Sequence, residues 1–201
     1  MIPQDVLDKL GIFNNKKYLI ANGEVDLYEK NKSGEVCLKC KLNNDTVVFI
    51  DPEKNTLPYL DESIKGAKAC PDKFLFEFDS DSQCILHVIE FKKTINTSSI
   101  AKSKKQFEMG IYNARAIAGF LNFQLKEIRI YSAYRYDMIE NMEQDILIQM
   151  RYANINSDVL DMIREWRASR CCLNLDSEKI TFKHGKIPLD QYGKGIYVLE
   201  S

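Results

Sequence analysis

The sequence predicts one α/β domain in which helices cover a β-sheet. Three observations predict it: strand-like alternation of polar and apolar residues, two apolar segments around a short polar turn, and a long stretch with helical apolar spacing. The chain has 201 residues, of which 45% are hydrophobic, so it can bury one sizeable core. No repeat, low-complexity tract or domain linker interrupts it. We therefore expect residues 1–201 to form a single domain.

The N-terminal quarter has the pattern of a β-meander. After a short amphipathic start that contains Val6 and Leu10, residues 24–50 alternate in strand fashion. Two clusters of turn-forming residues, 31–34 and 43–45, interrupt the alternation. We therefore expect consecutive antiparallel strands over 24–50.

The centre of the chain has the pattern of a β-hairpin. Residues 73–78 and 84–91 are apolar strand segments, and the polar turn 79–83 joins them. If Phe78 pairs with Cys84, the antiparallel register keeps the sum of paired residue numbers at 162. This register gathers five large apolar side chains on one face, so burial supports it. They are Phe74, Phe76, Phe78, Leu86 and Val88.

A long helix and a further strand follow. Apolar residues recur at helical spacing over 99–122, with Ser98 or Ser99 as the N-cap. Because these residues occupy more than one stripe, the helix should pack across the sheet. Residues 125–136 have the composition and pattern of a strand. The core hairpin, helix and strand therefore span 69–136.

The region 157–201 is expected to contain a helix and strands. Residues 158–170 form an amphipathic pattern that Ser157 can cap. The tail after Lys183 is expected to be irregular or an edge strand. The segment 137–156 fits neither a helix nor a strand clearly.

Composition excludes several classes of function. Lys plus Arg (28) nearly balances Asp plus Glu (29), so any nucleic acid would need a local basic surface. With only two histidines, His-rich metal sites are not expected. Gly193-Lys194-Gly195 lacks the upstream glycine of a phosphate-binding loop, and no GxGxxG opens a helix after a strand, so neither an NTPase nor a nucleotide-dependent oxidoreductase is expected.

The sequence also indicates a cellular setting. The N-terminus lacks the pattern of an export signal, and no run approaches the ~18 apolar residues of a membrane span, so we expect a cytoplasmic protein without a membrane partner. The six cysteines are then expected to be reduced. Cys37 and Cys40 form a CxxC, but no second half of a zinc site accompanies it, so both are expected to be packed strand residues.

Two acids and a lysine converge at one end of the predicted hairpin. In the register above Asp72 falls opposite Glu90, about 5 Å away, where like charges repel each other. Lys92 follows Glu90 by two residues and projects to the same side. One lysine does not neutralise two acids, whereas a divalent cation with oxygen ligands would. A structural ion pair at the strand end is the alternative interpretation.

These residues carry a resemblance to a known group of enzymes. Pro71-Asp72, seventeen residues, and then Glu90-Phe91-Lys92 resemble the signature of the PD-(D/E)XK superfamily of restriction-like and RecB-like nucleases. The surrounding hairpin and the helix with Lys105-Gln106-Phe107 are similar as well. The resemblance covers 69–136 and implies a restriction-endonuclease-like core, a mixed central sheet flanked by helices.

The resemblance implies roles for individual residues. Asp72 and Glu90 would be ligands of Mg²⁺ or Mn²⁺, with the carbonyl of Phe91 as a further ligand, and Lys92 would orient or activate the attacking water. Gln106 would approach the site, or it is a surface amide of the helix. An additional upstream acid is common in the superfamily. The candidates here are Glu53, Asp61 and Glu62.

The expected function is hydrolysis of nucleic-acid phosphodiesters, with DNA favoured over RNA; endonuclease and exonuclease action both stay open. Metal-assisted chemistry suits this reaction because it stabilises charge on the phosphate. Four lysines after the site either contact flanking phosphates or form a solvated face: Lys93, Lys102, Lys104 and Lys105. The alternative function is an inactive module of the same fold that binds nucleic acid or protein. A homodimer is compatible with the sequence.

Aromatic residues outside the hairpin are expected mainly in the core. Trp166, Tyr131, Tyr134 and Tyr136 are interpreted as core or strand-packing residues, with base stacking as the alternative. His87 is interpreted as a packed strand residue.

Overall fold

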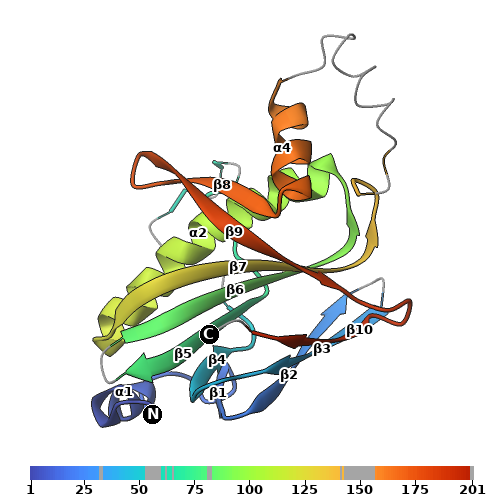
Figure 1. Cartoon of the computed structure of the whole chain (residues 1–201). Helices are drawn as coiled ribbons and strands as arrows, with labels where there is room; N and C mark the ends of the chain where they lie inside the picture. Colours follow the sequence, from blue (N-terminus) through green and yellow to red (C-terminus); the bar gives the residue numbers. More distant parts are fainter. Residues whose placement is uncertain are drawn as a thin grey trace.

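The fold consists of two sheets and three helices among the residues that are described (Figure 1). The computed structural model describes residues 1–31, 34–52, 60–61, 63–64, 66–80, 83–140, 142 and 157–199. The strands are β1 (Tyr18–Ala21), β2 (Glu24–Asn31), β3 (Gly34–Lys41), β4 (Thr46–Phe49), β5 (Lys73–Ser80), β6 (Gln83–Ile95), β7 (Gln124–Asp137), β8 (Arg170–Leu175), β9 (Glu178–Pro188) and β10 (Lys194–Val198). The helices are α1 (Gln4–Leu10), α2 (Thr97–Leu121) and α4 (Ser157–Arg167).

The larger sheet is mixed and has seven strands in the order β1-β4-β5-β6-β7-β9-β8. Strands β1, β4, β5 and β6 pair antiparallel, β6, β7 and β9 pair parallel, and β8 pairs antiparallel with β9. The predicted α/β class with a mixed sheet and flanking helices is therefore confirmed.

The second sheet has three strands in the order β10-β3-β2. Strands β2 and β3 form the expected antiparallel hairpin, but β4 leaves it and pairs with β1 and β5 in the larger sheet. The predicted single meander over 24–50 is wrong for this reason. All four residues of β4 are buried, with Val47 on the helix side and Val48 between the sheets. A strand that is apolar on both faces is more stable inside the central layer than at an exposed position.

The central hairpin has the predicted register. Lys73 pairs with Ile89 and Phe78 with Cys84, so paired numbers add up to 162 along this stretch. The phenylalanine face packs against α2, whereas Leu75 and Ile89 on the other face pack against the three-stranded sheet. Both faces of the hairpin are thus covered, which explains why its residues are almost continuously apolar.

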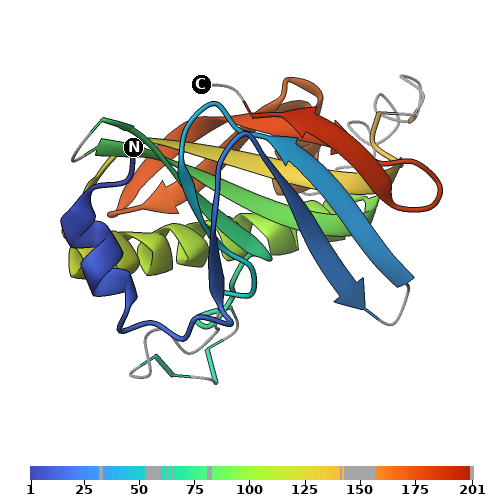
Figure 2. The same cartoon turned by 90° about the horizontal axis from the view of Figure 1, so that it is seen from below.

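Helix α2 crosses the larger sheet, as its apolar stripes predicted (Figure 2). It begins two residues earlier than expected, because Asn96 is the N-cap instead of Ser98 or Ser99. The Asn96 side chain accepts a hydrogen bond from Ser99 N at 2.9 Å, and the Ser99 hydroxyl accepts one from Asn96 N at 2.8 Å. This reciprocal capping box fixes the start of the helix directly after β6.

The C-terminal region differs from expectation at the end of its helix. Helix α4 ends at Arg167 because Ser169 adopts a left-handed conformation (φ 50°) and β8 starts at Arg170. Strand β9 pairs with β8 over residues 178–183 and with β7 over residues 184–188. The part after Lys183 is therefore paired on one side only, and β10 is an edge strand of the smaller sheet, so the prediction of edge strand after Lys183 is confirmed.

Core assignments for single residues are mostly confirmed. Trp166, Tyr131 and Tyr134 are buried, and Cys40 and His87 are completely buried within strands. Tyr136 is the exception, with 51% of its surface exposed. Within the described part of the chain, no helix combines the length and apolarity that crossing a bilayer requires.

Candidate active site

The candidate site lies where β5 begins and its pairing with β6 stops, whereas β6 itself continues to Ile95. Asp72 directly precedes β5, and continuing the hairpin register by one pair from Lys73 and Ile89 places it opposite Glu90. The Asp72 carboxylate accepts a hydrogen bond from Phe91 N, with Oδ2 at 2.7 Å. This bond ties β5 and β6 together beyond their last ladder pair and holds the acid beside β6.

Lys92 and Gln106 complete the cluster from β6 and α2. The Lys92 ammonium donates to Glu90 Oε1 and also to Gln106 Oε1, the latter at 2.9 Å. The Gln106 amide in turn donates to the carbonyl of Cys70 at 3.0 Å. Gln106 is 8% exposed, so of its two interpretations the contact with the site is confirmed and the surface amide is wrong. Helix α2 therefore orients the lysine through this amide.

Glu90 is buried in a cluster that holds two acids and one ammonium. It is 2% exposed, and its pKa is raised to about 7, first by burial and then by the charge of Asp72, while Lys92 acts in the opposite direction. Its Oε2 atom is buried and has no hydrogen-bond partner among the described residues. Burial also raises the pKa of Asp72, against the opposing effect of the Phe91 N–H. The cluster thus has one buried acceptor oxygen that no described residue satisfies.

The side chains of the cluster can supply only some of the ligands of a divalent cation. Among the described residues, no group of three or more His, Cys, Asp or Glu side chains gathers as metal ligands. Mg²⁺ is commonly held by one or two carboxylates together with waters and substrate phosphates, and it prefers oxygen ligands. The carboxylates of Asp72 and Glu90 are consistent with that set of ligands, and Glu90 Oε2 has no partner among the described residues.

Of the three candidates for an upstream acid, only Asp61 is among the described residues, and its hydrogen bond is made outside the cluster. Asp61 is exposed, and its carboxylate accepts a hydrogen bond from Ser63 N at 2.8 Å within its own loop. Glu53 and Glu62 lie outside the described residues.

Two charged residues that the sequence analysis missed lie beside the cluster. Lys73 is 2% exposed; its Nζ lies 3.0 Å from Glu29 Oε2 on β2 and 5.9 Å from the centre of the Phe91 ring. The charge of Glu29 also contributes to the raised pKa of Asp72. Lys73 could have been predicted from the sequence, because it is a lysine at an inward-facing position of an apolar strand. Nothing in the residue spacing identified Glu29 as its partner.

The four candidate phosphate-binding lysines fall into two groups. Lys104 pairs with Glu165 and Lys105 with Glu108, each at 2.8 Å, so their charges are already balanced. Lys93 and Lys102 are exposed, and in the described part of the chain neither has a carboxylate partner. Since neighbouring strand residues point to opposite faces, Lys93 projects away from Lys92, toward the side of the three-stranded sheet.

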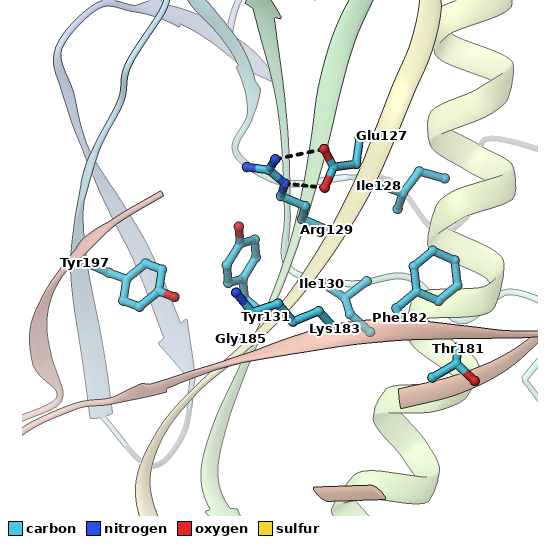
Figure 3. A pocket seen from close by; sticks show the side chains of 10 residues that line it. All are labelled: Glu127, Ile128, Arg129, Ile130, Tyr131, Thr181, Phe182, Lys183, Gly185 and Tyr197. Carbon is cyan, nitrogen blue, oxygen red and sulfur yellow. Dashed lines mark hydrogen bonds and ion pairs between the residues drawn. The ribbon is translucent and has the colours of Figure 1, made fainter. Parts of the chain in front are cut away.

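A separate hollow of about 210 Å³ opens between β7, β9 and β10 (Figure 3). Its arginine is already neutralised, because Arg129 Nε and Nη2 donate to the two oxygens of Glu127 at 2.7 and 2.8 Å. Tyr131 in its wall hydrogen-bonds the buried His87 at 3.1 Å. The hollow shares no described lining residue with the acidic cluster, so we treat it as separate from the candidate site.

Comparisons of the chain with protein-family models, with curated proteins and with solved structures found no match. The function must therefore be argued from the chemistry of the cluster itself.

Proposed function

We propose that this protein is a divalent-metal-dependent nuclease that hydrolyses phosphodiester bonds of nucleic acid, with DNA favoured over RNA. One observation carries the proposal: two carboxylates and one ammonium meet where the β5–β6 pairing stops, and Glu90 Oε2 is buried without a partner among the described residues. Such a charge excess is unfavourable in the protein alone and is relieved when a cation binds.

Asp72 and Glu90 are the groups that would hold Mg²⁺ or Mn²⁺, with the carbonyl of Phe91 as a third ligand. When bound, the cation supplies stabilisation of the negative charge that develops on the phosphate. The Phe91 N–H holds one oxygen of Asp72 in place, and Lys92 holds one oxygen of Glu90. Each carboxylate therefore has a fixed orientation, which favours a preorganised site.

Lys92 is the group in a position to act on the attacking water. Its ammonium is oriented by Glu90 and by Gln106, which is itself anchored to the carbonyl of Cys70. Only 12% of the lysine side chain is exposed, so its contacts with Glu90 and Gln106 fix its position. A fixed ammonium beside the reacting phosphate can orient water by hydrogen bonding and balance developing charge.

The test is a cleavage assay on purified protein with labelled single- and double-stranded DNA and RNA, with Mg²⁺, Mn²⁺ or a chelator. We expect cleavage with either metal and none with the chelator. Asp72→Asn, Glu90→Gln and Lys92→Met should each lower the rate by roughly 10²–10⁴-fold, the scale of losing a catalytic group. Asp79→Asn is the matched control, because Asp79 is a carboxylate at the other end of β5 and pairs with Lys126.

Thermal unfolding separates a catalytic site from a structural ion cluster. A metal that binds only the folded state raises the melting temperature, and this rise should vanish in Asp72→Asn and Glu90→Gln but persist in part in Lys92→Met. If the parent protein cuts no nucleic acid with any divalent ion and each substitution lowers the metal-free melting temperature, the nuclease proposal fails and an inactive binding module is the better interpretation.

A further inference from the structure

Arg135, on β7, points toward the three-stranded sheet and lies between two glycines there. Its Nη2 donates to the carbonyl of Glu35 on β3 at 2.9 Å, whereas the Glu35 side chain alternates with buried Val36 and points to the outer face. A Cβ atom on Gly193, just before β10, would lie 2.5 Å from Arg135 Nη2, and one on Gly34 would lie 3.6 Å from it. Both glycines have positive φ, 79° and 121°. The absence of side chains at these two positions leaves room for the guanidinium.

Lys93, on β6, projects to the same side of the larger sheet as Arg135. Lys92 donates to Gln106 on α2, and neighbouring strand residues point to opposite faces, so Lys93 faces the three-stranded sheet. The β6–β7 register pairs Lys92 with Tyr134. The next residues on the two strands are Lys93 and Arg135, which are therefore neighbours. Two cations placed side by side repel each other unless an anion balances them.

The acids on the neighbouring segments do not balance this pair. Glu29 forms an ion pair with a buried lysine of β5 at 3.0 Å. The carboxylate of Asp137 accepts a hydrogen bond from an indole N–H at 2.8 Å, and that of Asp190 accepts two from backbone N–H groups of its own turn, at 2.8 and 2.9 Å. In the described part of the chain, neither Arg135 nor Lys93 has a carboxylate partner.

We propose that Arg135 and Lys93 bind one phosphate group, on the side of the larger sheet opposite Lys92 and the acidic cluster. An arginine held by a backbone carbonyl keeps further N–H donors in a fixed plane, and these suit the oxygens of a phosphate. Lys93 is exposed, and Arg135 lines an open hollow of about 470 Å³, so a ligand can reach both. The bound anion removes the repulsion between the two cations.

Two sources can supply this phosphate. The proposed nuclease function supplies the backbone of a bound nucleic acid, with the contact made away from the residues that would cut it. A free phosphate ion or a mononucleotide carries the same group. The site itself does not rest on the nuclease proposal, because it is argued from the two cations alone and can be tested without cleavage.

Nucleic-acid binding in chelator is the first test. Fluorescence anisotropy would measure the affinity of the full chain for a labelled DNA duplex and for one of its single strands, over a range of salt concentrations. Lys93→Gln and Arg135→Gln should each weaken binding about 5- to 10-fold. The double variant should lower the salt slope on the duplex by about 0.9, the value for one phosphate, and not by about twice as much. Arg129→Gln changes the net charge equally and should alter neither quantity, because Glu127 already neutralises Arg129.

Thermal unfolding with small anions is the second test. Sodium phosphate and deoxyadenosine monophosphate would each be compared with sodium chloride of equal ionic strength, which controls for general salt effects. Each should raise the melting temperature of the parent and of Arg129→Gln by about 2–4 °C more than that of Lys93→Gln. Lys93 is exposed, so its substitution tests the site without disturbing the position of Arg135 between the glycines.

The outcomes decide both the site and its ligand. A loss of oligonucleotide affinity confined to Lys93→Gln and Arg135→Gln supports the site with a backbone phosphate as ligand. Unchanged oligonucleotide affinity together with the expected effect of the small anions supports it with a free phosphate. If both variants behave like Arg129→Gln in both tests, or if the two single losses multiply fully in the double variant, a shared phosphate is wrong. A parent protein that binds through these residues but cuts nothing with Mg²⁺ or Mn²⁺ keeps the site, while the nuclease proposal fails.

Discussion

Glu90 is the residue at which burial and charge oppose each other most directly. Its carboxylate is nearly inaccessible, one of its oxygens has no partner in the described structure, and Asp72 adds a second negative charge nearby. Lys92 balances one of the two acids. Removing the charge of Glu90 therefore leaves one acid, Asp72, and one ammonium, Lys92. Without metal, this balanced pair costs less free energy to bury than two acids with one ammonium.

We expect Glu90→Gln to raise the melting temperature of the metal-free protein at high pH. The folded-state pKa of about 7 lies above the ordinary value of 4.5, so the stabilising contribution of protonated Glu90 is complete below about 4.5 and is lost as the pH rises through 7. Glutamine mimics the protonated form. The increase should be about 2–6 °C at pH 8 and should shrink toward pH 5. A lower melting temperature at pH 8 in chelator would contradict this charge assignment.

At the scale of elements, α2 lies directly on the segment that positions Asp72. A Cβ on Gly110 would lie 2.5 Å from Pro71 Cδ and 3.3 Å from the Phe74 ring. Pro71 is the residue before Asp72, so the close approach of helix and loop helps to place the acid. Gly119, farther along the same helix, has nothing within 4 Å of its Cβ position.

The two glycines should respond in opposite directions to alanine. Gly119→Ala should raise the free energy of unfolding by about 0.5–1 kcal/mol, because alanine favours the helix and no contact opposes it. Gly110→Ala should lower it despite the same helical preference, since Pro71 must move, and it should also reduce cleavage. Urea unfolding measures both values, and a stabilised Gly110→Ala variant would show that the helix can move away from Pro71 without cost.

At the scale of the whole molecule, a buried polar network lies on the face of the larger sheet that meets the three-stranded sheet. His87 Nε2 lies 2.8 Å from Glu77 Oε2, His87 Nδ1 lies 3.1 Å from the Tyr131 hydroxyl, and Asn44 donates to the other oxygen of Glu77 at 2.9 Å. Burial lowers the pKa of His87. Burial acts to raise the pKa of Glu77, but its hydrogen bond with His87, the charge that His87 carries when protonated and the hydrogen bond from Asn44 act in the opposite direction, and the net shift is downward. Neutral His87 therefore donates to ionised Glu77 and accepts from Tyr131.

Tyr131→Phe should lower the free energy of unfolding by about 1–3 kcal/mol, because it leaves His87 Nδ1 buried without its donor. Tyr136→Phe is the control: its ring is half exposed, and we expect a change within about 0.5 kcal/mol. Chemical denaturation near neutral pH, where His87 is neutral, measures both. Equal effects of the two substitutions would mean that the hydroxyl of Tyr131 adds nothing to the contact between the sheets.

The sequence by itself determined the parts of the molecule that depend on local periodicity. The register of the β5–β6 hairpin followed from alternation and from a short turn, and it placed Asp72 beside Glu90 and Lys92 with no knowledge of the rest of the chain. Helix α2 and strand β7 followed in the same way from their apolar spacing. Such patterns are local because side-chain direction repeats every 2 or 3.6 residues.

Tertiary structure alone decided which distant segments meet. It moved β4 into the larger sheet, joined the two halves of β9 to β8 and to β7, and brought Glu29 to Lys73 across 44 positions. It also separated the lysines, pairing Lys104 with Glu165 and leaving Lys93 beside Arg135. Periodicity shows which face of a segment is buried but not what covers it, and that choice depends on how all the elements share one core.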